Sequence, residues 1–428
     1  MATIIAEPNY WSAPKKAGFR FAFIFFIGYV FFNPNGVYQN FITGIFSDSL
    51  HNFVNWFAQH FLHVKQPISI FMSGSGDTTY AYVVLLLTFI SALIGTLLWS
   101  LLDNKARNYN KLYYWLTVIL RFYVGIMMIQ YGLIKVVKLQ FSSPSLDRLL
   151  ATYGESSPMG LAWTYLGFSN GFNYFAGLAE ITCGVLLLFR RTALFGAFLG
   201  VVVAGNIMVI NYCFDVPVKL MSTALVVMCL FLLLRDAERL INVFFMNKTA
   251  PPSDFAPHRF QKPWKNITLV VVKCLVLLQC LFGSIVGVIM SASEYGDNAK
   301  KPPLYGIYKV DTFVRNNDTI LPLTTDTNRW SRLVISYVNN ARIRTMNDSS
   351  KYVSFKVDTQ KHSIVINTYA DTSQKYHFTY TQPQPNVLLL KGKWQQDSLK
   401  IKFNRFDEKK FLLTNRGFHW ISEYPFNR

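Results

Sequence analysis

Residues 113–137 read YYWLTVILRFYVGIMMIQYGLIKVV, an apolar stretch that contains two basic side chains. A helix needs about 20 apolar residues to cross the hydrocarbon core of a bilayer. Glycine and charged residues recur in this stretch at helical spacing, so they form one stripe along one face. The sequence therefore predicts a membrane-spanning helix whose packing face carries glycines and charges. The members of the stripe are Arg121, Gly125, Met128, Gly132 and Lys135.

Six other apolar runs have a similar length. Of the 428 residues, 51% are hydrophobic and only 15% are charged, whereas soluble chains carry about 25% charged residues. This composition excludes a disordered chain, a disulfide-stapled secreted scaffold and a purely cytosolic enzyme. All five cysteines fall in the apolar runs and no Cys-x-x-Cys motif is present, which argues against a disulfide framework or a thiol-redox site. The seven predicted spans are 17–33, 80–102, 113–137, 171–189, 192–213, 217–234 and 266–290.

Basic residues predict the orientation of these spans. Lys and Arg gather in alternate connections, such as 105–111 and 190–191, and are scarcer in the others. Cytoplasmic loops carry this excess, so we expect a multi-pass cell-membrane protein with a cytoplasmic N-terminus. The first span is expected to be retained as a signal anchor. The predicted parts are an N-terminal two-span region with an external amphipathic helix over 1–112, a four-helix membrane domain over 113–245, a cytoplasmic linker and seventh span over 246–299, and an exocytoplasmic β-domain over 300–428.

After residue 305 the pattern changes to alternation with a period of two. Val353, Phe355 and Val357 alternate with polar residues, and turn-forming clusters at 347–350 and 382–385 separate such runs. This pattern predicts about eight antiparallel strands that close into a small barrel or sandwich, similar to the lipocalin type of barrel in pattern only. The predicted fold class is an α-helical polytopic membrane bundle with a C-terminal all-β domain.

The net charge is +19, and more than half of it lies in residues 300–428. A basic patch can bind nucleic acid. However, no aromatic-and-glycine motif for nucleic acid is present, and the β-domain is predicted to face away from the cytoplasm. We therefore favour a solvated basic surface near anionic headgroups over nucleic-acid binding.

Ionisable residues inside the spans are the candidate functional groups, because each costs at least about 2.5–3.5 kcal/mol at the bilayer centre and usually has a partner. The fourth span carries a second glycine-and-polar stripe that contains Asn173, Gly177, Glu180 and Gly184. Small residues on such faces let two helices approach closely, so we expect the third and fourth spans to pack together. Both Arg121 and Glu180 are predicted near mid-membrane. Their pairing has two interpretations: it fixes the register of two helices, or it belongs to a polar cavity that opens outward.

Further polar residues extend this prediction toward the outer face. Asn206 falls in the fifth span, and Asp215 and Lys219 are four residues apart at the entry to the sixth, near the predicted outer position of Lys135. Lys273 lies well inside the seventh span. It either faces the cavity or, as is commoner for lysine, extends to the inner headgroups.

Two amphipathic segments are predicted outside the spans. In the first outer loop, residues 50–64 have an apolar face and a face with His51 and His63, with His60 beside it. No carboxylate or cysteine completes a metal ligand set there, so we predict an interfacial helix and no metal site. Residues 145–154 are predicted to form a second interfacial or re-entrant helix.

The motifs from Arg121 to about Arg239 resemble a DoxX-family domain, a four-helix membrane module. Two predicted spans before this region, one after it and the β-domain depart from the module. In chain order the matching features are Arg121 early in a span, Gly132-Leu-Ile-Lys135 near its end, an amphipathic segment at 146–150, Glu180 before Gly184-Val-Leu-Leu187, and the basic turn Arg190-Arg191.

The resemblance implies an integral membrane protein. Some members of the family are linked to thiosulfate:quinone oxidoreductase, and the module is distantly similar to the membrane bundle of the vitamin K-dependent carboxylase. Both associations imply quinone chemistry. No haem, flavin or iron–sulfur motif is present, so no intrinsic cofactor is expected, and a redox role requires a diffusible quinone or a partner subunit.

Our leading hypothesis is a membrane protein that binds a quinone or small anion; if it is an enzyme, it is a quinone-linked oxidoreductase subunit. Glu180 and Lys135 are the predicted catalytic residues, because a reduced quinone gains charge and protons. One alternative is a transporter of a small molecule. Another is a non-enzymatic scaffold whose β-domain recruits an envelope protein. The lipid bilayer is an expected partner under each hypothesis. The predicted binding residues are Arg121, Asn206, Asp215, Lys219 and Lys273.

Overall fold

The computed structural model describes residues 10–35, 47–65, 74–103, 105–250, 259–369 and 374–427, and the single residues 37, 44, 68 and 252. It divides into two compact units. The first, which we call the membrane bundle, comprises Met1–Phe141 and Ser169–Ala292. The second, which we call the β-domain, comprises Ser142–Phe168 and Ser293–Arg428. Most of the predicted cytoplasmic linker, residues 253–258, lies outside the described residues.

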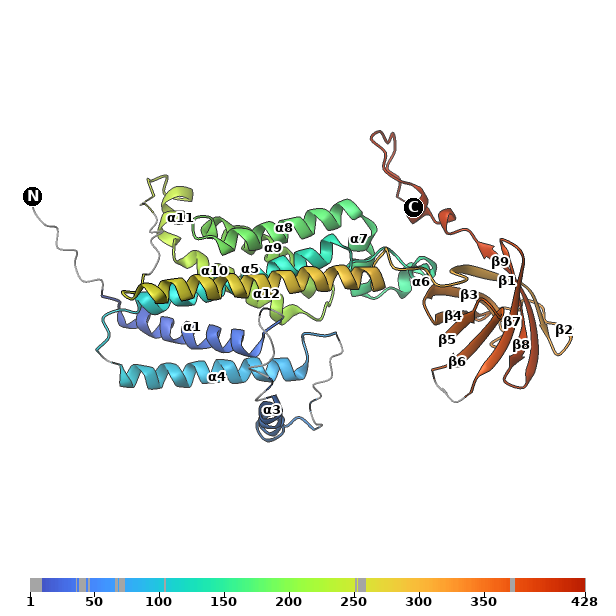
Figure 1. Ribbon diagram of the computed structural model, residues 1–428, viewed down its shortest axis with the longest axis horizontal. Helices are drawn as coiled ribbons and strands as arrows, with labels where there is room; N and C mark the ends of the chain where they lie inside the picture. Colours follow the sequence, from blue (N-terminus) through green and yellow to red (C-terminus); the bar gives the residue numbers. More distant parts are fainter. Residues whose placement is uncertain are drawn as a thin grey trace, which may run out of the picture. The chain divides into compact units, whose positions relative to one another are not determined.

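Long helices make up the membrane bundle, and Figure 1 shows them running side by side. Each of the seven predicted spans coincides with a helix, and the ends differ by a few residues. The helices are α1 (Ala13–Phe32), α4 (Thr79–Leu102), α5 (Asn110–Val136), α8 (Asn170–Leu188), α9 (Ala193–Cys213), α10 (Lys219–Leu234) and α12 (Pro263–Tyr295).

The structure contains helices that could cross a membrane, as predicted, whereas the count of seven spans stays a prediction. Among the described residues, five helices are long and apolar enough to cross a membrane: α4, α5, α8, α9 and α12. A sixth is added if α10 and the short helix α11 (Ala237–Phe244) form one span, although they are bent by 80°. Helix α1 has 20 residues, but Lys15, Lys16 and Arg20 occupy its first half.

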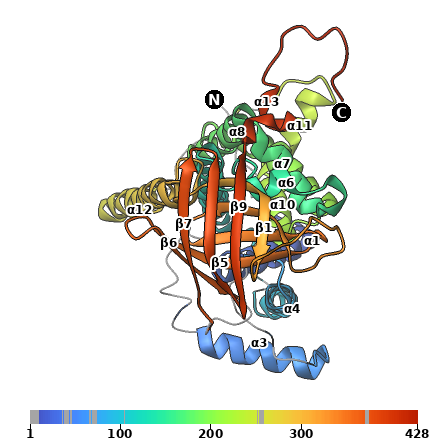
Figure 2. The same ribbon diagram turned by 90° about the vertical axis from the view of Figure 1, so that its right-hand side faces the viewer.

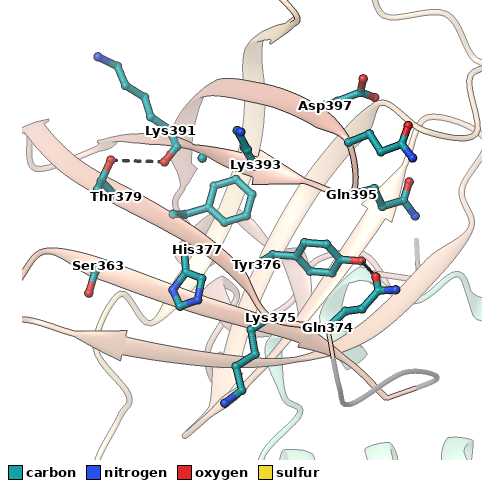
Figure 3. Close-up of a pocket in the computed structure, with 13 residues that line it drawn as sticks. Ser363, Gln374, Lys375, Tyr376, His377, Thr379, Lys391, Lys393, Gln395 and Asp397 are labelled. Carbon is teal, nitrogen blue, oxygen red and sulfur yellow. Dashed lines mark hydrogen bonds between the residues drawn. The ribbon is translucent and has the colours of Figure 1, made fainter.

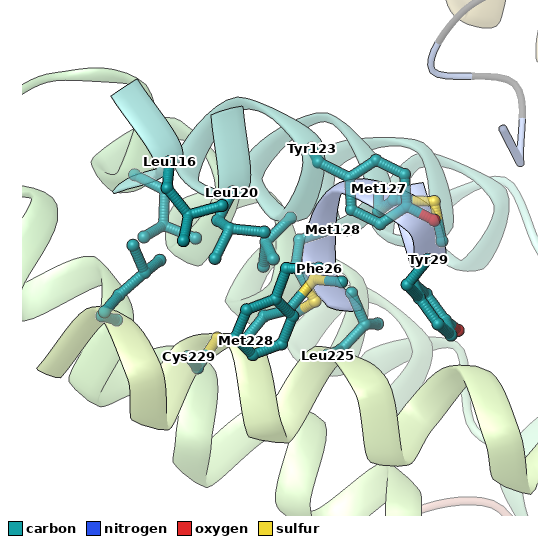
Figure 4. Close-up of a cluster of buried hydrophobic side chains, with 14 of the residues drawn as sticks. Phe26, Tyr29, Leu116, Leu120, Tyr123, Met127, Met128, Leu225, Met228 and Cys229 are labelled. Atoms are coloured by element: carbon teal, nitrogen blue, oxygen red, sulfur yellow. The ribbon is translucent and has the colours of Figure 1, made fainter. Parts of the chain in front are cut away.

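Helix α5 forms the centre of the bundle. It buries Leu116, Leu120 and Met127 completely, and Figure 4 shows these side chains beside Phe26 of α1 and Met228 of α10. A helix that is buried on several faces must be apolar around most of its circumference. The charged residues of the α5 stripe are therefore exceptions in an otherwise apolar helix.

Arg20 joins α1, α4 and the start of α5. Its side chain is 6% exposed, and it donates hydrogen bonds to the Tyr109 hydroxyl (2.9 Å), the Ser100 hydroxyl (2.7 Å) and the Asp103 carbonyl (2.8 Å). The Tyr109 hydroxyl in turn donates to the Asp103 carboxylate at 2.9 Å, and this bond lowers the pKa of Asp103. A buried guanidinium is tolerated when its donors are satisfied in this way.

The predicted amphipathic helix of the first loop is present as α3 (Ser47–Phe61). Val54 and Ala58 are fully buried and pack with Val83 and Val84 of α4. In contrast, the aromatic side chain of Trp56 is 48% exposed, which suits an interfacial position. His51 contacts Asn55 at 2.9 Å on the polar face.

The β-domain contains an antiparallel barrel of eight long strands, as predicted, and Figure 2 shows its strands. Consecutive strands pair in a meander, and β1 closes the barrel by pairing with β9. The two-residue strand β2 (Asp318–Thr319) extends one edge. The others are β1 (Gly306–Arg315), β3 (Trp330–Tyr337), β4 (Asn340–Thr345), β5 (Ser350–Asp358), β6 (Ser363–Thr368), β7 (Tyr376–Gln384), β8 (Val387–Trp394) and β9 (Asp397–Phe406).

Large apolar side chains fill the interior of the barrel, among them Phe313, Phe355, Phe378 and Phe403. Because residues alternate between the two faces of a strand, the polar residues between them lie outside. The basic character of residues 300–428 is therefore carried by the outer surface of the barrel.

Residues 142–168 form part of the β-domain. They include α6 (Leu146–Leu150), a 3-10 turn (Tyr153–Glu155) and α7 (Pro158–Phe168). The Asp147 carboxylate accepts a hydrogen bond from Ser336 of β3 at 2.9 Å and lies 3.7 Å from Arg342 of β4. The predicted helix over 145–154 thus corresponds to α6 and the turn, and it packs against the barrel.

Candidate functional site

The two glycine stripes pack against each other, as predicted. The space beside each glycine shows how close the backbones are: a Cβ atom on Gly132 would lie 2.6 Å from the carbonyl oxygen of Gly177, and one on Gly125 would lie 3.1 Å from that of Gly184. The order of these contacts makes α5 and α8 antiparallel. Only glycine allows two helices to approach this closely at two levels.

Glu180 pairs with Lys135, not with Arg121, so the predicted Arg121–Glu180 pair is wrong. The Lys135 ammonium donates a hydrogen bond to Oε1 of Glu180, and the two side chains are only 6% and 2% exposed. Side chains on a helix lean toward its N-terminus. Because α5 and α8 are antiparallel, the Lys135 and Glu180 side chains therefore lean toward each other. The spacing of residues along one helix does not predict this pairing.

The carboxylate of Glu180 keeps one oxygen available. Within the described residues, Oε2 is buried and has no hydrogen-bond partner. The Tyr131 side chain lies within electrostatic range of Glu180, and its hydroxyl contacts the sulfur of Met221 at 3.4 Å. A buried carboxylate oxygen without a partner is costly, so this atom is available to bind a proton or a ligand donor.

Arg121 lies at the opposite end of the α5–α8 contact. Its Nε donates a hydrogen bond of 2.9 Å to the carbonyl oxygen of Leu187, in the last turn of α8. Carbonyls in the last turn of a helix have no donor within that helix and carry partial negative charge. Arg121 thus caps α8, while its side chain, 6% exposed, also borders a pocket.

We call this cavity the Arg121 pocket. It has a volume of about 660 Å³ and lies between α5, the end of α8 and α12. Its walls are mainly apolar and aromatic, and Lys273 of α12 enters it over the ring of Phe122 at 5.3 Å. The polar and aromatic lining residues are Tyr114, Trp115, Arg121, Phe122, Phe189, Arg190, Arg191 and Lys273.

A smaller cavity of about 110 Å³ shares Arg121, Arg190 and Arg191 with this pocket. Arg235, Asp236 and Arg239 complete its charged lining. Asp236 accepts a hydrogen bond from Arg239 at 2.8 Å. The two cavities together concentrate basic side chains around one carboxylate, so this end of the bundle has a positive potential.

Arg121 and Lys273 therefore share one pocket, and their predicted binding role stays a prediction. However, the pocket lies at the end of α5 that is predicted to be cytoplasmic. The predicted outward-opening cavity is thus not the one that Arg121 lines. Arg190 and Arg191 were interpreted from the sequence as orientation signals and as the basic turn of the DoxX-like motif. Their spacing gave no sign that Arg121 would lie beside them.

Asp215 and Lys219, both predicted at the outer face, contact each other at 2.8 Å. The hydrogen bond from Lys219 lowers the pKa of Asp215. The carboxylate of Asp77 was missed: it accepts hydrogen bonds from the backbone N–H groups of Lys219 (2.8 Å) and Leu220 (3.0 Å). Asp77 therefore caps the N-terminus of α10, which indicates a structural role for this cluster.

Asn206 is exposed on α9, and it lines neither of the two cavities described above. The buried amide on this helix is instead Asn211, which donates to the Ser222 hydroxyl of α10 at 3.0 Å. Apart from Asn206, the predicted site residues thus fall into three groups: the Lys135–Glu180 pair, the Arg121 pocket with Lys273, and the Asp215–Lys219 contact.

The chain is similar to the uncharacterized protein YwoB of Bacillus subtilis (strain 168). The two are 40% identical over 124 residues, which cover 29% of this chain and 79% of YwoB. No family model matches the chain, so its resemblance to the DoxX family stays a prediction. No solved structure matches it either.

Proposed function

The chain belongs to the family of the Bacillus subtilis protein YwoB, and from its own geometry we propose that the membrane bundle binds a lipid-soluble molecule with an anionic or quinone-like headgroup in the Arg121 pocket. The observation that carries this proposal is the position of Arg121. A buried guanidinium lies where an apolar pocket meets a cluster of arginines.

The comparison with Arg20 supports a ligand at Arg121. Both side chains are 6% exposed. Arg20 donates hydrogen bonds from all three of its nitrogens, whereas the described contact of Arg121 is the single bond from Nε to Leu187. Planar guanidinium groups bind carboxylate and phosphate with two parallel hydrogen bonds, so the remaining nitrogens of Arg121 suit an anionic headgroup.

The walls of the pocket support a lipid-soluble ligand. Val118 and Ile119 of α5 and Val270 and Val276 of α12 line it, and these side chains offer no polar partner. Ligand pockets of roughly 300–1,000 Å³ combine apolar walls with a few placed polar groups. A molecule with an anionic head and a hydrocarbon tail matches this division between arginines and aliphatic walls.

A quinone is the second candidate ligand. The rings of Trp115, Phe122 and Phe189 give the pocket flat apolar surfaces, and a quinone headgroup gains negative charge on reduction. Glu180 and Lys135 lie at the opposite end of the α5–α8 contact, so they would exchange protons with this quinone only through a relay. The site for such a proton is Oε2 of Glu180, which has no hydrogen-bond partner among the described residues.

The proposal is tested by what the purified chain retains. We expect a substoichiometric to stoichiometric amount of an anionic lipid or a quinone to co-purify in mild detergent, detected by native mass spectrometry. Ultraviolet spectra of the solvent extract, recorded before and after reduction, distinguish a quinone from a phosphate-bearing lipid. The variant Arg190→Gln/Arg191→Gln should retain at least about tenfold less ligand, since each 1.4 kcal/mol of binding free energy is a factor of ten.

The matched control is Lys105→Gln/Lys111→Gln. It removes two exposed basic residues at the same end of the bundle but outside the pocket. Its ligand content should equal that of the parent. Equal loss in both variants, or a parent protein that retains neither class of molecule, contradicts the proposal.

A further inference from the structure

The largest described pocket of the β-domain lies on strands β6, β7 and β8 and at the turn between β8 and β9. Its volume is about 1180 Å³, and Figure 3 shows Lys375 and Lys391 extending from opposite sides of it. We call it the β-groove. Pockets for drug-sized ligands are usually about 300–1,000 Å³, so the β-groove has room for an extended molecule. Because apolar side chains fill the barrel interior, a ligand of the barrel would bind on this outer surface.

The charge of the β-groove is strongly unbalanced. It is lined by Lys375, Lys391, Lys393 and His377, with Asp397 as the only acidic lining residue. Asp397 accepts a hydrogen bond of 2.6 Å from the amide of Asn316. In the part of the chain that the structure describes, none of the three lysines forms an ion pair. The β-groove is therefore a site of positive potential.

Some other basic residues of the barrel have acidic partners. Lys402 lies 2.8 Å from Asp311, and Arg344 lies 3.0 Å from Asp348. In contrast, Lys391 is directly opposite Lys400 in the β8–β9 pairing. Like charges at opposed strand positions destabilise a sheet, and a bound anion would relieve that repulsion.

The uncharged lining groups are suited to hydroxyl-rich ligands. Gln395, Gln396 and Thr379 offer exposed amide and hydroxyl groups, which both donate and accept hydrogen bonds. The ring of Tyr376 is fixed by Trp394, 4.5 Å away between centroids, and its hydroxyl donates to Gln374 at 2.5 Å. This arrangement places a half-buried aromatic ring among polar groups on the floor of the β-groove (Figure 3).

We propose that the β-groove binds an acidic glycan, a chain of sugars that carries carboxylate or phosphate groups. The lysines would neutralise the acidic groups, and the amides, hydroxyls and Tyr376 would contact the sugar rings. A concave groove with amide groups fits such a chain better than it fits the flat surface of an anionic membrane. This site is independent of the Arg121 pocket, because it lies in the other structural unit.

The test uses the full chain in nanodiscs made only of zwitterionic lipid. Oligogalacturonate is the carboxylated probe, and a maltooligosaccharide of matched length is the neutral probe. We expect the carboxylated glycan to bind and the neutral one to bind at least about tenfold more weakly. Raising the ionic strength from about 0.1 M to about 1 M shortens the Debye length from about 10 Å to about 3 Å and should weaken binding.

The variant Lys375→Gln/Lys391→Gln/Lys393→Gln should bind oligogalacturonate at least about tenfold more weakly. Its matched control is Lys356→Gln/Lys361→Gln/Lys410→Gln, which removes three exposed lysines from the same domain outside the β-groove. The control should stay within about twofold of the parent, because exposed charges that do not contact the ligand contribute little.

Three results would overturn the proposal. One is equal weakening in the two triple variants, which would mean binding by overall charge. Another is equal binding of the neutral and carboxylated glycans. The third is binding of vesicles that contain anionic lipid, with no binding of oligogalacturonate, because this would assign the basic surface to a membrane.

Discussion

The Lys135–Glu180 pair gives the sharpest test of the membrane bundle, because both side chains are almost fully removed from solvent. Removing one partner of a buried pair leaves an unpaired charge and costs about 3–5 kcal/mol, whereas replacing both is often neutral. We therefore expect Lys135→Met and Glu180→Gln each to lower the free energy of unfolding by about 3–5 kcal/mol. The double variant should lower it by no more than about 2 kcal/mol.

The expected non-additivity follows from the Coulomb energy. Two unit charges 4 Å apart attract by about 4 kcal/mol at an effective dielectric constant of 20. With single losses of about 3 kcal/mol or more and a double loss of about 2 kcal/mol or less, the double-mutant cycle should give a coupling free energy of at least about 4 kcal/mol.

Steric trapping in bicelles of fixed lipid composition measures the four free energies of unfolding. The contact between the exposed Asp215 and the partly buried Lys219 is the control. The cycle of Asp215→Asn and Lys219→Met should be close to additive, because a pair with one solvent-exposed partner contributes little. A coupling below about 1 kcal/mol for Lys135 and Glu180 would refute the inference of a desolvated, mutually dependent pair.

Two further predictions concern helix packing and the β-domain. Gly177→Ala should destabilise the bundle by about 1–3 kcal/mol in the same assay, because the new Cβ would lie 2.6 Å from the carbonyl oxygen of Gly132. In contrast, Gly205→Ala should stabilise it by about 0.5–1 kcal/mol, because a Cβ at Gly205 meets no atom within 4 Å. Burial raises the pKa of Asp147. Between the ordinary carboxyl pKa and this raised pKa, the native state therefore binds more protons than the unfolded state. The contribution of Asp147 to stability thus falls as the pH rises through the raised pKa. The melting temperature of Asp147→Asn relative to the parent should therefore be higher at pH 7 than at pH 4. The melting temperature of Asp358→Asn relative to the parent should instead be lower at pH 7 than at pH 4, because the hydrogen bond from the N–H of Lys361 lowers the pKa of Asp358. The same pH trend in both variants would contradict the opposite pKa shifts of Asp147 and Asp358.

The positions of the helices and the barrel could be predicted from local sequence. Apolar length and strand alternation depend on residues close together in the chain, and burial against lipid or core enforces them. The close packing of α5 and α8 could also be predicted, because glycines at helical spacing, such as Gly125 and Gly132, form a face whatever the partner helix is.

The partners of the charged residues could not be predicted in the same way. Whether Glu180 meets Arg121 or Lys135 depends on the register and direction of two helices and on how their side chains lean. Likewise, the cap that Asp77 provides to α10 joins residues about 140 positions apart, and the packing of α6 against β3 depends on the tertiary contact of Asp147 with Ser336. No periodicity in the sequence encodes such contacts.

Arg121 and Lys135 lie on the same stripe of α5, but their surroundings separate their roles. At a rise of 1.5 Å per residue, their backbones lie about 21 Å apart along the helix. Lys135 meets a buried carboxylate, whereas Arg121 meets a carbonyl and neighbouring arginines. A cation surrounded by like charges favours an anion from outside the chain.

This separation makes the double variant Lys135→Met/Glu180→Gln informative about function. If the pair only joins α5 to α8, the folded double variant should retain the parent's ligand in the Arg121 pocket. If Glu180 exchanges protons with a bound quinone, the double variant should retain the ligand and lose quinone-coupled activity. Loss of the ligand itself, in a variant whose unfolding free energy is close to that of the parent, would show that the two regions form one site and would refute their separation along α5.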